Sequence, residues 1–356
     1  MAVDVDARSG IERIDAVYLW VDGADPRFQR NFAIHVARHA GSLAAEAARR
    51  HRFRDNDELR YSLRSLESFA SWTGNIHIVT NGQVPKWLNS GHERIRLVSH
   101  DGIFPDYSCL PTFNSCAIEL NLHRIPGLSR RFLYLNDDLY LGREMRREDF
   151  LPPDGSHRFY VEPTFVNRHF AHGPVHDRAY LHTIRVLDRL WGRGRRRTSP
   201  AYFHSWKDGL LNRRPRRRLP AHTPQLYDRE ILADLEFLLA GEFQATRNHR
   251  FRSPEDLVLR LVYFYSLLES GRYPGAVEAV RLDWESDLYF FLMLDDSLPR
   301  LREKLATIGR LRPKFFCIND DLEEAAVDHP VLRYQRDFLQ DFFPRPGSFE
   351  KLEGLS

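Results

Sequence analysis

Residues 110–142 read LPTFNSCAIELNLHRIPGLSRRFLYLNDDLYLG, and they decide the fold that we expect for this chain. Within them, residues 132–135 form a short apolar and aromatic run, which is typical of a buried strand. The run ends at Asn136-Asp137-Asp138, and two adjacent carboxylates are costly to bury without partners. We therefore expect them at the rim of a sheet, where ligands bind in open α/β folds. A polar turn before the next strand is the alternative interpretation.

The first half of the same stretch predicts a helix over residues 115–123, which begins after an Asn114-Ser115 cap. This helix places Glu119 among apolar neighbours. A carboxylate in that setting, together with the two acids at the strand end, favours a functional site over a plain turn.

The chain has 356 residues, of which 42% are hydrophobic and 12% aromatic, so it can bury a large core in one domain or two. Its formal net charge of +3 gives no field that would attract a polyanion. Cys109, Cys116 and Cys317 show neither paired nor metal-ligand spacing, so we do not expect a disulfide scaffold. This agrees with a reducing compartment.

The N-terminal sequence MAVDVDARSG is acidic and polar, which is not typical of a signal peptide. No apolar run approaches the roughly 20 residues that a membrane span needs. We therefore expect a cytoplasmic protein, and peripheral contact with the inner face of the cell membrane stays open.

Three further runs are rich in β-branched and aromatic residues and predict strands. They cover residues 14–21, 76–80 and 95–98. Helical stretches lie between them: residues 28–52 are rich in alanine and arginine, and Leu59, Leu63 and Leu66 repeat at helical spacing. Short strands that alternate with helices predict βαβ units and a mostly parallel sheet.

Two features near these strands suggest ligand contacts. Asp22 follows the first strand, where a carboxylate could bind a ribose or a metal, and a plain turn residue is the alternative. Arg60 and Arg64 share one helix face, and two guanidinium groups suit a pyrophosphate. The alternative is a solvated face paired with Asp57 and Glu67.

The middle of the chain is harder to interpret. Residues 158–161 predict a strand, and residues 168–182 are rich in histidine. The histidine spacing fits no compact metal site, so we expect a polar loop or an acceptor-binding surface there. Two basic runs cover residues 193–197 and 213–218. Without a nucleic-acid-binding signature, we expect them in solvated loops or against an anionic glycan or lipid surface.

His222 lies between Pro220 and Pro224, which would stiffen its loop and hold the imidazole, although a purely structural histidine is the alternative. A helix is predicted over residues 228–239. Another is predicted from Ser253 as its N-cap to Leu268. Arg252 stands just before this cap, so the positive end of the helix would add to an anion site there.

Near the end, residues 314–318 repeat the pattern of an apolar run, and Asn319-Asp320-Asp321 follows it. This offers a second cluster of amide and carboxylate groups at a strand exit. A final helix over residues 330–343 would pack on the core.

These segments resemble the four conserved blocks of the Stealth family of sugar-1-phosphate transferases. The blocks here are IDAVYLWVDGADP from Ile14; RFRDNDELRYSLRSLE from Arg52, continuing through IHIVTNGQVPKWLN to NDDLYLG; LPAHTP…FRSPEDL from Leu219; and KFFCINDDLEE…RDFLQDFFPRPGSFE from Lys314. The family includes bacterial capsule and exopolysaccharide phosphotransferases and the catalytic subunit of the animal transferase that tags lysosomal enzymes with N-acetylglucosamine 1-phosphate.

The resemblance covers nearly the whole chain, with two departures. The animal member has a second histidine where this chain has Gln225, which points to His222 as the histidine that matters. The large inserted modules of the animal enzyme are missing, so recognition of a protein acceptor is not carried over.

The resemblance implies a reaction. A UDP-sugar, such as UDP-N-acetylglucosamine, would donate its sugar 1-phosphate to a hydroxyl of a glycan or polysaccharide acceptor and release UMP. Phosphoryl transfer of this kind needs positioning, charge neutralisation and a base. Mg²⁺, with Mn²⁺ as the alternative, would bridge the diphosphate oxygens.

The resemblance also implies the roles of particular residues. The expected catalytic set is Glu119, Asp138, His222 and Arg252. The expected metal ligands are Asp138 first, then Asp137, Asn319 and Asp320. The expected substrate-binding residues are Asp22, Arg60, Arg64 and Asn114. His222 is the expected general base, with Glu119 as the alternative.

The expected fold is α/β, with a Rossmann-like, glycosyltransferase-A-like, mostly parallel sheet. Residues 12–150 would form the nucleotide-sugar-binding core, 151–218 an inserted segment, and 219–356 the part that completes one catalytic domain. We expect no nucleic-acid partner, and a homo-oligomer stays open. A metal-dependent glycosyltransferase that releases UDP and a non-catalytic glycan-binding protein are the competing functions.

Overall fold

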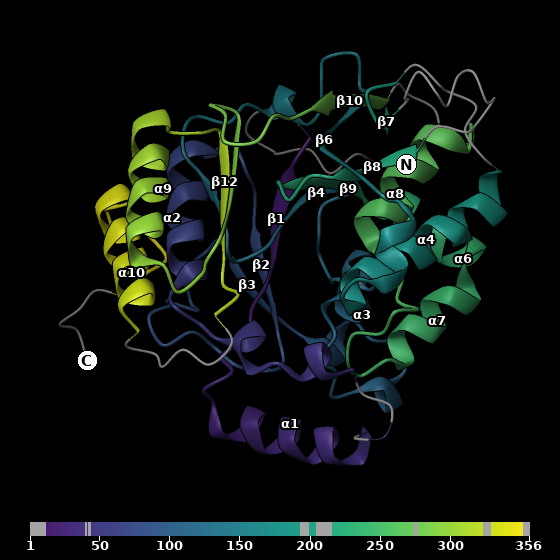
Figure 1. Ribbon diagram of the computed structural model, residues 1–356, viewed down its shortest axis with the longest axis horizontal. Coiled ribbons are helices and arrows are strands. Elements are labelled where there is room, and N and C mark those ends of the chain that lie inside the picture. The colour runs from purple at the N-terminus through teal and green to yellow at the C-terminus, as the bar shows by residue number, and fades with distance from the viewer. Residues whose placement is uncertain are drawn as a thin grey trace.

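The computed structural model describes residues 12–39, 41, 44–192, 199–203, 216–273, 277–322 and 329–351. Its main sheet has five strands in the order β3-β2-β1-β4-β9 (Figure 1). These strands are β1 (Ile14–Leu19), β2 (Ile76–Thr80), β3 (Ile95–Ser99), β4 (Arg131–Leu135) and β9 (Gln225–Asp228). The first four are parallel and β9 runs antiparallel to β4. The predicted mostly parallel, Rossmann-like sheet is therefore confirmed.

The central strands are buried on both faces, which explains why their sequences read as unbroken apolar runs. In β1, Val17 belongs to one apolar cluster, whereas Ala16 and Tyr18 belong to another. This alternation is the two-residue period of a strand with a core on each side. Helix α2 (Glu58–Phe69) covers one face, and α4 (Val175–Trp191) and α8 (Leu259–Glu269) lie on the other (Figure 1).

Two smaller sheets adjoin the main one. The first has the order β11-β12-β5 and the second β10-β6-β8-β7. Their strands are β5 (Leu139–Leu141), β6 (His157–Phe165), β7 (Tyr202–Phe203), β8 (Arg216–Pro220), β10 (Val277–Arg281), β11 (Tyr289–Met293) and β12 (Phe315–Asn319). Strand β5 follows Asp138 and pairs antiparallel with β12, with Leu139 opposite Cys317. This register brings the end of β12 beside the Asp137-Asp138 turn.

The remaining helices surround these sheets. The α-helices are α1 (Pro26–His39), α3 (Ser115–Glu119), α6 (Arg229–Leu238), α7 (Ala240–Asn248), α9 (Leu298–Leu311) and α10 (Pro330–Phe342). The short 3₁₀ helices are η1 (Ala45–Ala48), η2 (Arg50–Phe53), η3 (His100–Gly102), η4 (Tyr107–Cys109), η5 (Leu122–Arg124), η6 (Arg147–Asp149) and η7 (Arg168–His172). Among the residues that the structure describes, no helix has the length and apolar character needed to cross a bilayer.

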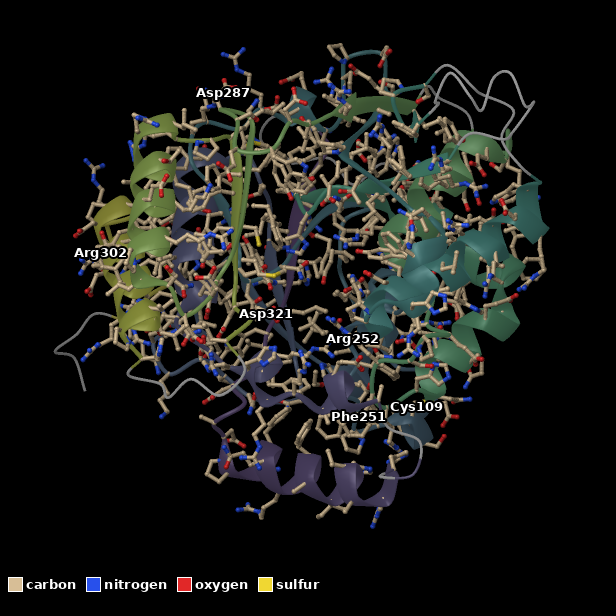
Figure 2. All side chains as sticks on the ribbon, viewed as in Figure 1. Cys109, Phe251, Arg252, Asp287, Arg302 and Asp321 are labelled. Carbon is tan, nitrogen blue, oxygen red and sulfur yellow. The ribbon has the colours of Figure 1, made fainter. Side chains whose placement is uncertain are left out.

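Helix α1 lies apart from the main sheet, over a separate aromatic cluster (Figure 1). The cluster contains Phe28, Phe32, Phe53, Phe113 and Phe251. The Phe113 and Phe251 rings stack with centroids 5.1 Å apart. In Figure 2, Phe251 lies on the side of α1 and Arg252 lies nearer the centre of the molecule. The cluster thus joins α1 to three segments that are far apart in the sequence.

Several predicted elements differ from the structure. The helix expected over residues 28–52 ends as α1 at His39, and η1 and η2 lie in the second half of that range. The helix expected over residues 115–123 is divided into α3 and η5. The polar loop expected over residues 168–182 is largely helical, because the apolar face of α4 packs against the core.

The helix that was expected to begin at Ser253 begins at Leu259, as α8. The Asp256 carboxylate does accept from the Ser253 backbone NH at 2.8 Å. It also accepts from Asn114 Nδ2 at 2.9 Å and from His249 Nδ1 at 2.8 Å. These non-local partners hold residues 253–258 as a turn, so no helix N-terminus supports Arg252.

Of the two basic runs, residues 193–197 and 213–215 lie outside the described residues. Residues 216–218 belong to β8 and are not in a solvated loop. Arg217 is buried there and donates to Glu269 at 2.7 Å and to Asp188 at 2.8 Å. Buried carboxylate partners explain why this arginine is tolerated inside a sheet.

Candidate active site

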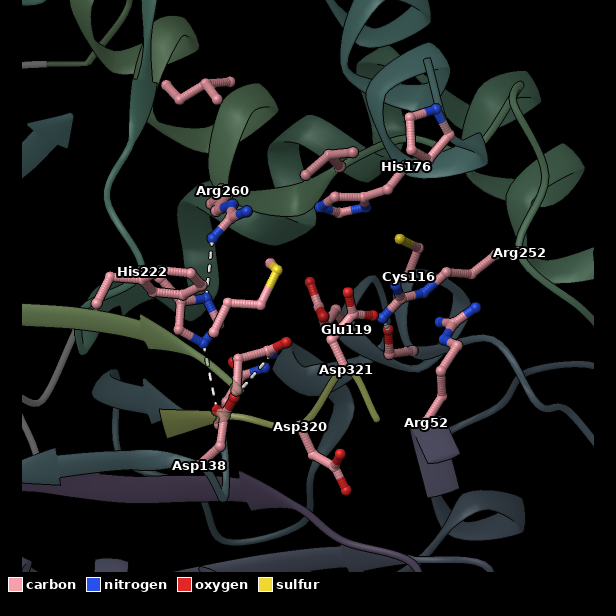
Figure 3. A pocket seen from close by; sticks show the side chains of 18 of the residues that line it. Arg52, Cys116, Glu119, Asp138, His176, His222, Arg252, Arg260, Asp320 and Asp321 are labelled. Atoms are coloured by element: carbon pink, nitrogen blue, oxygen red, sulfur yellow. Dashed lines mark hydrogen bonds and ion pairs between the residues drawn. The ribbon is translucent and has the colours of Figure 1, made fainter. Parts of the chain in front are cut away.

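A cavity of about 790 Å³ opens where β4 and β12 end. Its wall is formed by segments from the whole length of the described chain, including η2, α3, the turn after β4, α4, the β8–β9 connection and α8. Asp138 lies at one end with His222 and Arg260 beside it, and Arg52 and Arg252 lie at the other end (Figure 3). The predicted position at the carboxyl ends of the parallel strands agrees with this location.

The Asp138 carboxylate at the acidic end has three hydrogen-bond partners. Its Oδ2 accepts from Cys317 Sγ at 3.2 Å and from Asn319 Nδ2 at 3.1 Å. Its Oδ1 lies 3.3 Å from His222 Nε2. Burial alone would raise the pKa of Asp138, but His222 and the two other donors outweigh it, so its pKa is lowered. The ionised form of Asp138 is therefore favoured.

The second ring nitrogen of His222 fixes its tautomer. Arg260 Nη1 lies 3.2 Å from His222 Nδ1, and arginine can only donate. In the neutral ring Nδ1 must therefore accept, which leaves the proton on Nε2, facing Asp138. Burial lowers the pKa of His222, but the carboxylates of Asp138, Glu162 and Glu119 outweigh it and raise the pKa above its usual value.

Two carboxyl groups near the acidic end, those of Asp137 and Asp55, have strongly raised pKa values. Burial, with the neighbouring charges of Asp138 and Asp55, raises the pKa of Asp137 to about 8. Burial and the charge of Asp57 raise the pKa of Asp55 to about 7. Such an excess of buried negative charge is what a divalent cation would neutralise.

Two sets of side chains could hold a metal ion. Asp138, His222 and Cys317 place one ligand atom each within 4.8 Å of one another, and this mixed set suits a softer metal than magnesium. Burial, however, raises the pKa of Cys317, so its sulfur is a thiol that donates to Asp138. The oxygen-rich set of Asp137, Asp138 and Asn319 fits Mg²⁺ or Mn²⁺ better.

Asp320 also lines the cavity, but its charge is already paired. Arg54 Nη1 donates to Asp320 Oδ2 at 2.7 Å, and Asn56 donates to the same oxygen at 3.3 Å. We therefore do not include Asp320 among the metal ligands.

Glu119 ends helix α3 and faces the centre of the cavity (Figure 3). Tyr134 donates its hydroxyl to Glu119 Oε1 at 3.3 Å. Burial raises the pKa of Glu119, and the cations of Arg260 and Arg252 only partly oppose it. The carboxylate is therefore a readier proton acceptor than an exposed glutamate.

Arg252 lies at the basic end and donates to Ser115 Oγ at 3.0 Å. Glu119, Asp138, His222 and Arg252, which the family resemblance implies as one set, thus all line one cavity.

The structure places the other expected substrate-binding residues outside the lining of this cavity. Arg60 and Arg64 both form ion pairs with Glu350, at 2.6 Å and 2.5 Å. Their charges are therefore neutralised by a structural contact near the C-terminal end. Asp22 caps its own turn by accepting from the Ala24 backbone NH at 2.8 Å. Asn114 is buried and joins the start of α3 to Asp256. We do not carry these four residues into the site.

Sequence reasoning did not assign a role to several residues of the cavity wall. These are Arg52, Glu162, His176 and Arg260. The sequence does indicate Arg260, because it is the one charged residue in the otherwise apolar run LVLRLVYFY over residues 257–265. A lone charge within a buried helix usually has a specific partner.

Comparison with known protein families gives matches to one family, the Stealth proteins. Four Stealth protein conserved-region profiles match: CR1 at residues 12–32, CR2 at 52–159, CR3 at 221–267 and CR4 at 306–356. The exopolysaccharide phosphotransferase SCO6023 of Streptomyces coelicolor is 36% identical over 96% of this chain and 53% of its own length. The exopolysaccharide phosphotransferase CpsY of Mycobacterium leprae is 33% identical over 95% and 57%. The chain thus spans about half the length of these relatives.

Among solved structures, the galactosyltransferase LgtC has a TM-score of 0.42 and 10% identity over 96% of this chain and 98% of its own. Mouse xyloside xylosyltransferase 1 has a TM-score of 0.35 and 12% identity over 86% and 97%.

Proposed function

Because the chain belongs to the Stealth family, we propose that it is a sugar-phosphate transferase. It would move N-acetylglucosamine 1-phosphate, or a related hexose 1-phosphate, from a UDP-sugar to a hydroxyl of a glycan acceptor, in exopolysaccharide or capsule synthesis. The observation that carries this proposal is the meeting of Glu119, Asp138, His222 and Arg252 in one cavity with an acidic and a basic end.

In the proposed reaction, the acceptor oxygen attacks the β-phosphorus of the donor. The bond from that phosphorus to the oxygen that joins the two phosphates breaks, and UMP leaves. The acceptor proton passes to a base on the protein. The bond between the sugar and its phosphate stays intact, so the anomeric configuration is retained and the product is a phosphodiester.

We assign Asp137, Asp138 and Asn319 as the residues that would hold a divalent ion, Mg²⁺ or Mn²⁺. When bound, this ion would neutralise negative charge on the diphosphate. The ionised state of Asp138 supports the assignment, as does the close approach of Asp137 to it. At the other end, Arg252 would stabilise charge on the phosphoryl group in transfer.

Of the two candidate bases, the geometry favours Glu119. A base needs a free lone pair, and the lone pair of His222 accepts from Arg260, whereas the other nitrogen carries its proton toward Asp138. Glu119 has a raised pKa and accepts only one hydrogen bond in the described part of the chain. We therefore assign Glu119 as the base, and His222 as the residue that orients Asp138.

We further propose that the parts of the chain form one catalytic unit. Residues 12–150 supply Asp138 and Glu119, α4 supplies His176, and the C-terminal part supplies His222 and Arg252, all to the same cavity.

The deciding experiment incubates the protein with a panel of UDP-sugars, a glycan acceptor and Mg²⁺, and identifies the nucleotide released. UMP together with a phosphodiester product supports the proposal. UDP would mean glycosyl transfer instead, and no release from any donor would favour a binding protein. Glu119→Gln should abolish UMP release, whereas Glu162→Gln, a nearby carboxylate without the Tyr134 contact, should retain more of it.

A further inference from the structure

Two arginines at the basic end of the cavity lie beside each other. Arg52 is in η2, and Arg252 follows Phe251 of the aromatic cluster under α1. Both arginines line the cavity on the side away from the His222–Asp138 pair (Figure 3). Burial and the charge of Arg252 lower the pKa of Arg52 to about 8. Two guanidinium cations held this close destabilise each other unless an anion lies between them.

Neither cation has a carboxylate partner within the described ranges. Arg52 makes a long hydrogen bond of 3.5 Å to the carbonyl of Glu46. Arg252 donates to Ser115 Oγ, and its Nε is buried without a partner. Asp256 is near, but its two oxygens accept from Asn114, His249 and the Ser253 backbone. A buried donor that lacks a partner in this way indicates a ligand.

The fold holds the two arginines in place through their neighbours in the sequence. Phe53 follows Arg52 and Phe251 precedes Arg252, and both rings belong to the cluster under α1. Phe113 lies between them, 6.4 Å from the Phe53 centroid and 5.1 Å from the Phe251 centroid. Because the aromatic side chains are anchored on one side, the arginines are directed to the other, so the pair is assembled before any ligand arrives.

A third group extends the same wall. His176 of α4 is half-buried near Arg252, Arg260 and Arg52, and desolvation together with these cations lowers its pKa well below the usual value. The ring is therefore neutral. Its Nε2 bonds to Tyr180 at 2.8 Å, and its Nδ1 is buried without a partner. A neutral imidazole can offer a hydrogen bond to an anion without adding another like charge.

We propose that Arg52, Arg252 and His176 form a phosphate subsite that binds a phosphate monoester or phosphoryl group without needing a divalent ion. Two planar guanidinium groups can bind the oxygens of one phosphate in a bidentate way. The identity of the group rests on the proposed function: it would be the phosphate that becomes the link between sugar and acceptor. Arg52 is thus a second arginine of the transfer site.

The test measures binding of inorganic phosphate and of N-acetylglucosamine 1-phosphate by calorimetry, in the presence of EDTA. The wild type should bind both, and Arg52→Gln and Arg252→Gln should each bind about tenfold more weakly or worse. Arg52→Lys keeps the charge but not the planar fork, so its affinity for phosphate should lie between those of the wild type and Arg52→Gln. Arg30→Gln, an exposed arginine of α1, is the matched control and should bind normally.

A second measurement separates ligand binding from a purely structural role. Without phosphate, Arg52→Gln should melt at the same temperature as the wild type or higher, because the variant loses like-charge repulsion. With phosphate, the wild type should gain melting temperature and the variant should not. Lower stability of the variant together with unchanged phosphate binding would overturn the proposal. So would a wild type that binds no phosphate without metal.

The subsite and the proposed function can fail separately. If no UDP-sugar is turned over but phosphate binding depends on Arg52, the subsite stands and the transferase proposal fails. If UMP is released while Arg52→Gln binds phosphate and turns over substrate normally, the transferase stands and the subsite is wrong.

Discussion

His222 and Asp138 lie 84 residues apart in the chain, yet His222 Nε2 is 3.3 Å from Asp138 Oδ1. Arg260 lies on the opposite side of the same ring and donates to Nδ1. The three side chains therefore form a line in which the arginine selects the tautomer and the histidine orients the carboxylate.

Replacing Arg260 with glutamine should raise the pKa of His222. The wild-type cation disfavours a proton on Nδ1, and the carboxylates of Asp138, Glu162 and Glu119 would then act without that opposition. Observing the His222 ring protons by NMR during a pH titration measures the change. Activity should fall by one to two orders of magnitude, the usual cost of losing a residue that orients a metal ligand. A lower pKa in the variant would contradict this interpretation.

Replacing Asp138 with asparagine should abolish UMP release and leave the fold intact. The variant keeps the shape of the side chain but loses the charge, and it also relieves Asp137 of its nearest like charge. The expected change in the free energy of unfolding is within about 1 kcal/mol. Product analysis and thermal melting check the two parts. Asp101→Asn, at an exposed acid of η3, is the control. Near-normal release by Asp138→Asn would remove the residue from the mechanism.

Metal-free protein should lose stability as the pH rises from 6.5 to 8.5. The folded-state pKa values of Asp55 and Asp137, about 7 and about 8, lie above their unfolded values. Groups of this kind stabilise the fold fully at low pH, and the contribution is lost as the pH rises through the folded pKa. Asp137 alone should contribute about 1 to 2 kcal/mol to this loss.

Thermal melting in EDTA across this pH range measures the effect. Asp137→Asn should flatten the dependence, and saturating Mg²⁺ should flatten it in the wild type, because the ion takes the place of the proton. Wild-type stability that rises over the same interval would contradict the raised pKa values of Asp55 and Asp137.

Truncating Phe251 to alanine should both destabilise the protein and weaken phosphate binding. The ring is buried in the cluster with Phe32 and Phe113, and loss of a buried phenylalanine costs about 3 to 5 kcal/mol. Chemical denaturation and calorimetry measure the two effects. Phe251→Leu, which refills most of the volume, should recover most of the stability. If Phe251→Ala folds and binds phosphate as the wild type does, the cluster does not position Arg252.

The parts of this fold that could be predicted from the sequence are those that depend on local patterns. Strands β1, β2 and β4 were recognisable because strands buried on both faces are apolar throughout. Asp138 was recognisable as an acid at the end of such a strand. His222 was singled out because two prolines flank it.

The parts that could not be predicted depend on partners far away in the chain. Arg60 and Arg64 carry the right charge for a pyrophosphate, but Glu350, almost at the other end of the sequence, takes up both. The sequence of residues 253–258 resembles a helix start, but in the structure the Asp256 carboxylate accepts hydrogen bonds from Asn114 and His249. The position of Arg52 follows from Phe53 joining the cluster under α1, and nothing local to Arg52 indicates that.

Gly23, in the turn after β1, lies against η2. Its backbone NH donates to the Phe53 carbonyl at 2.7 Å, and a Cβ at this position would overlap that carbonyl oxygen. The absence of a side chain at residue 23 thus determines how closely the segment with Arg52 and Arg54 approaches the main sheet. Any larger residue would push this segment away from the turn after β1. The position of Arg52 in the cavity wall then depends on a residue that does not itself line the cavity.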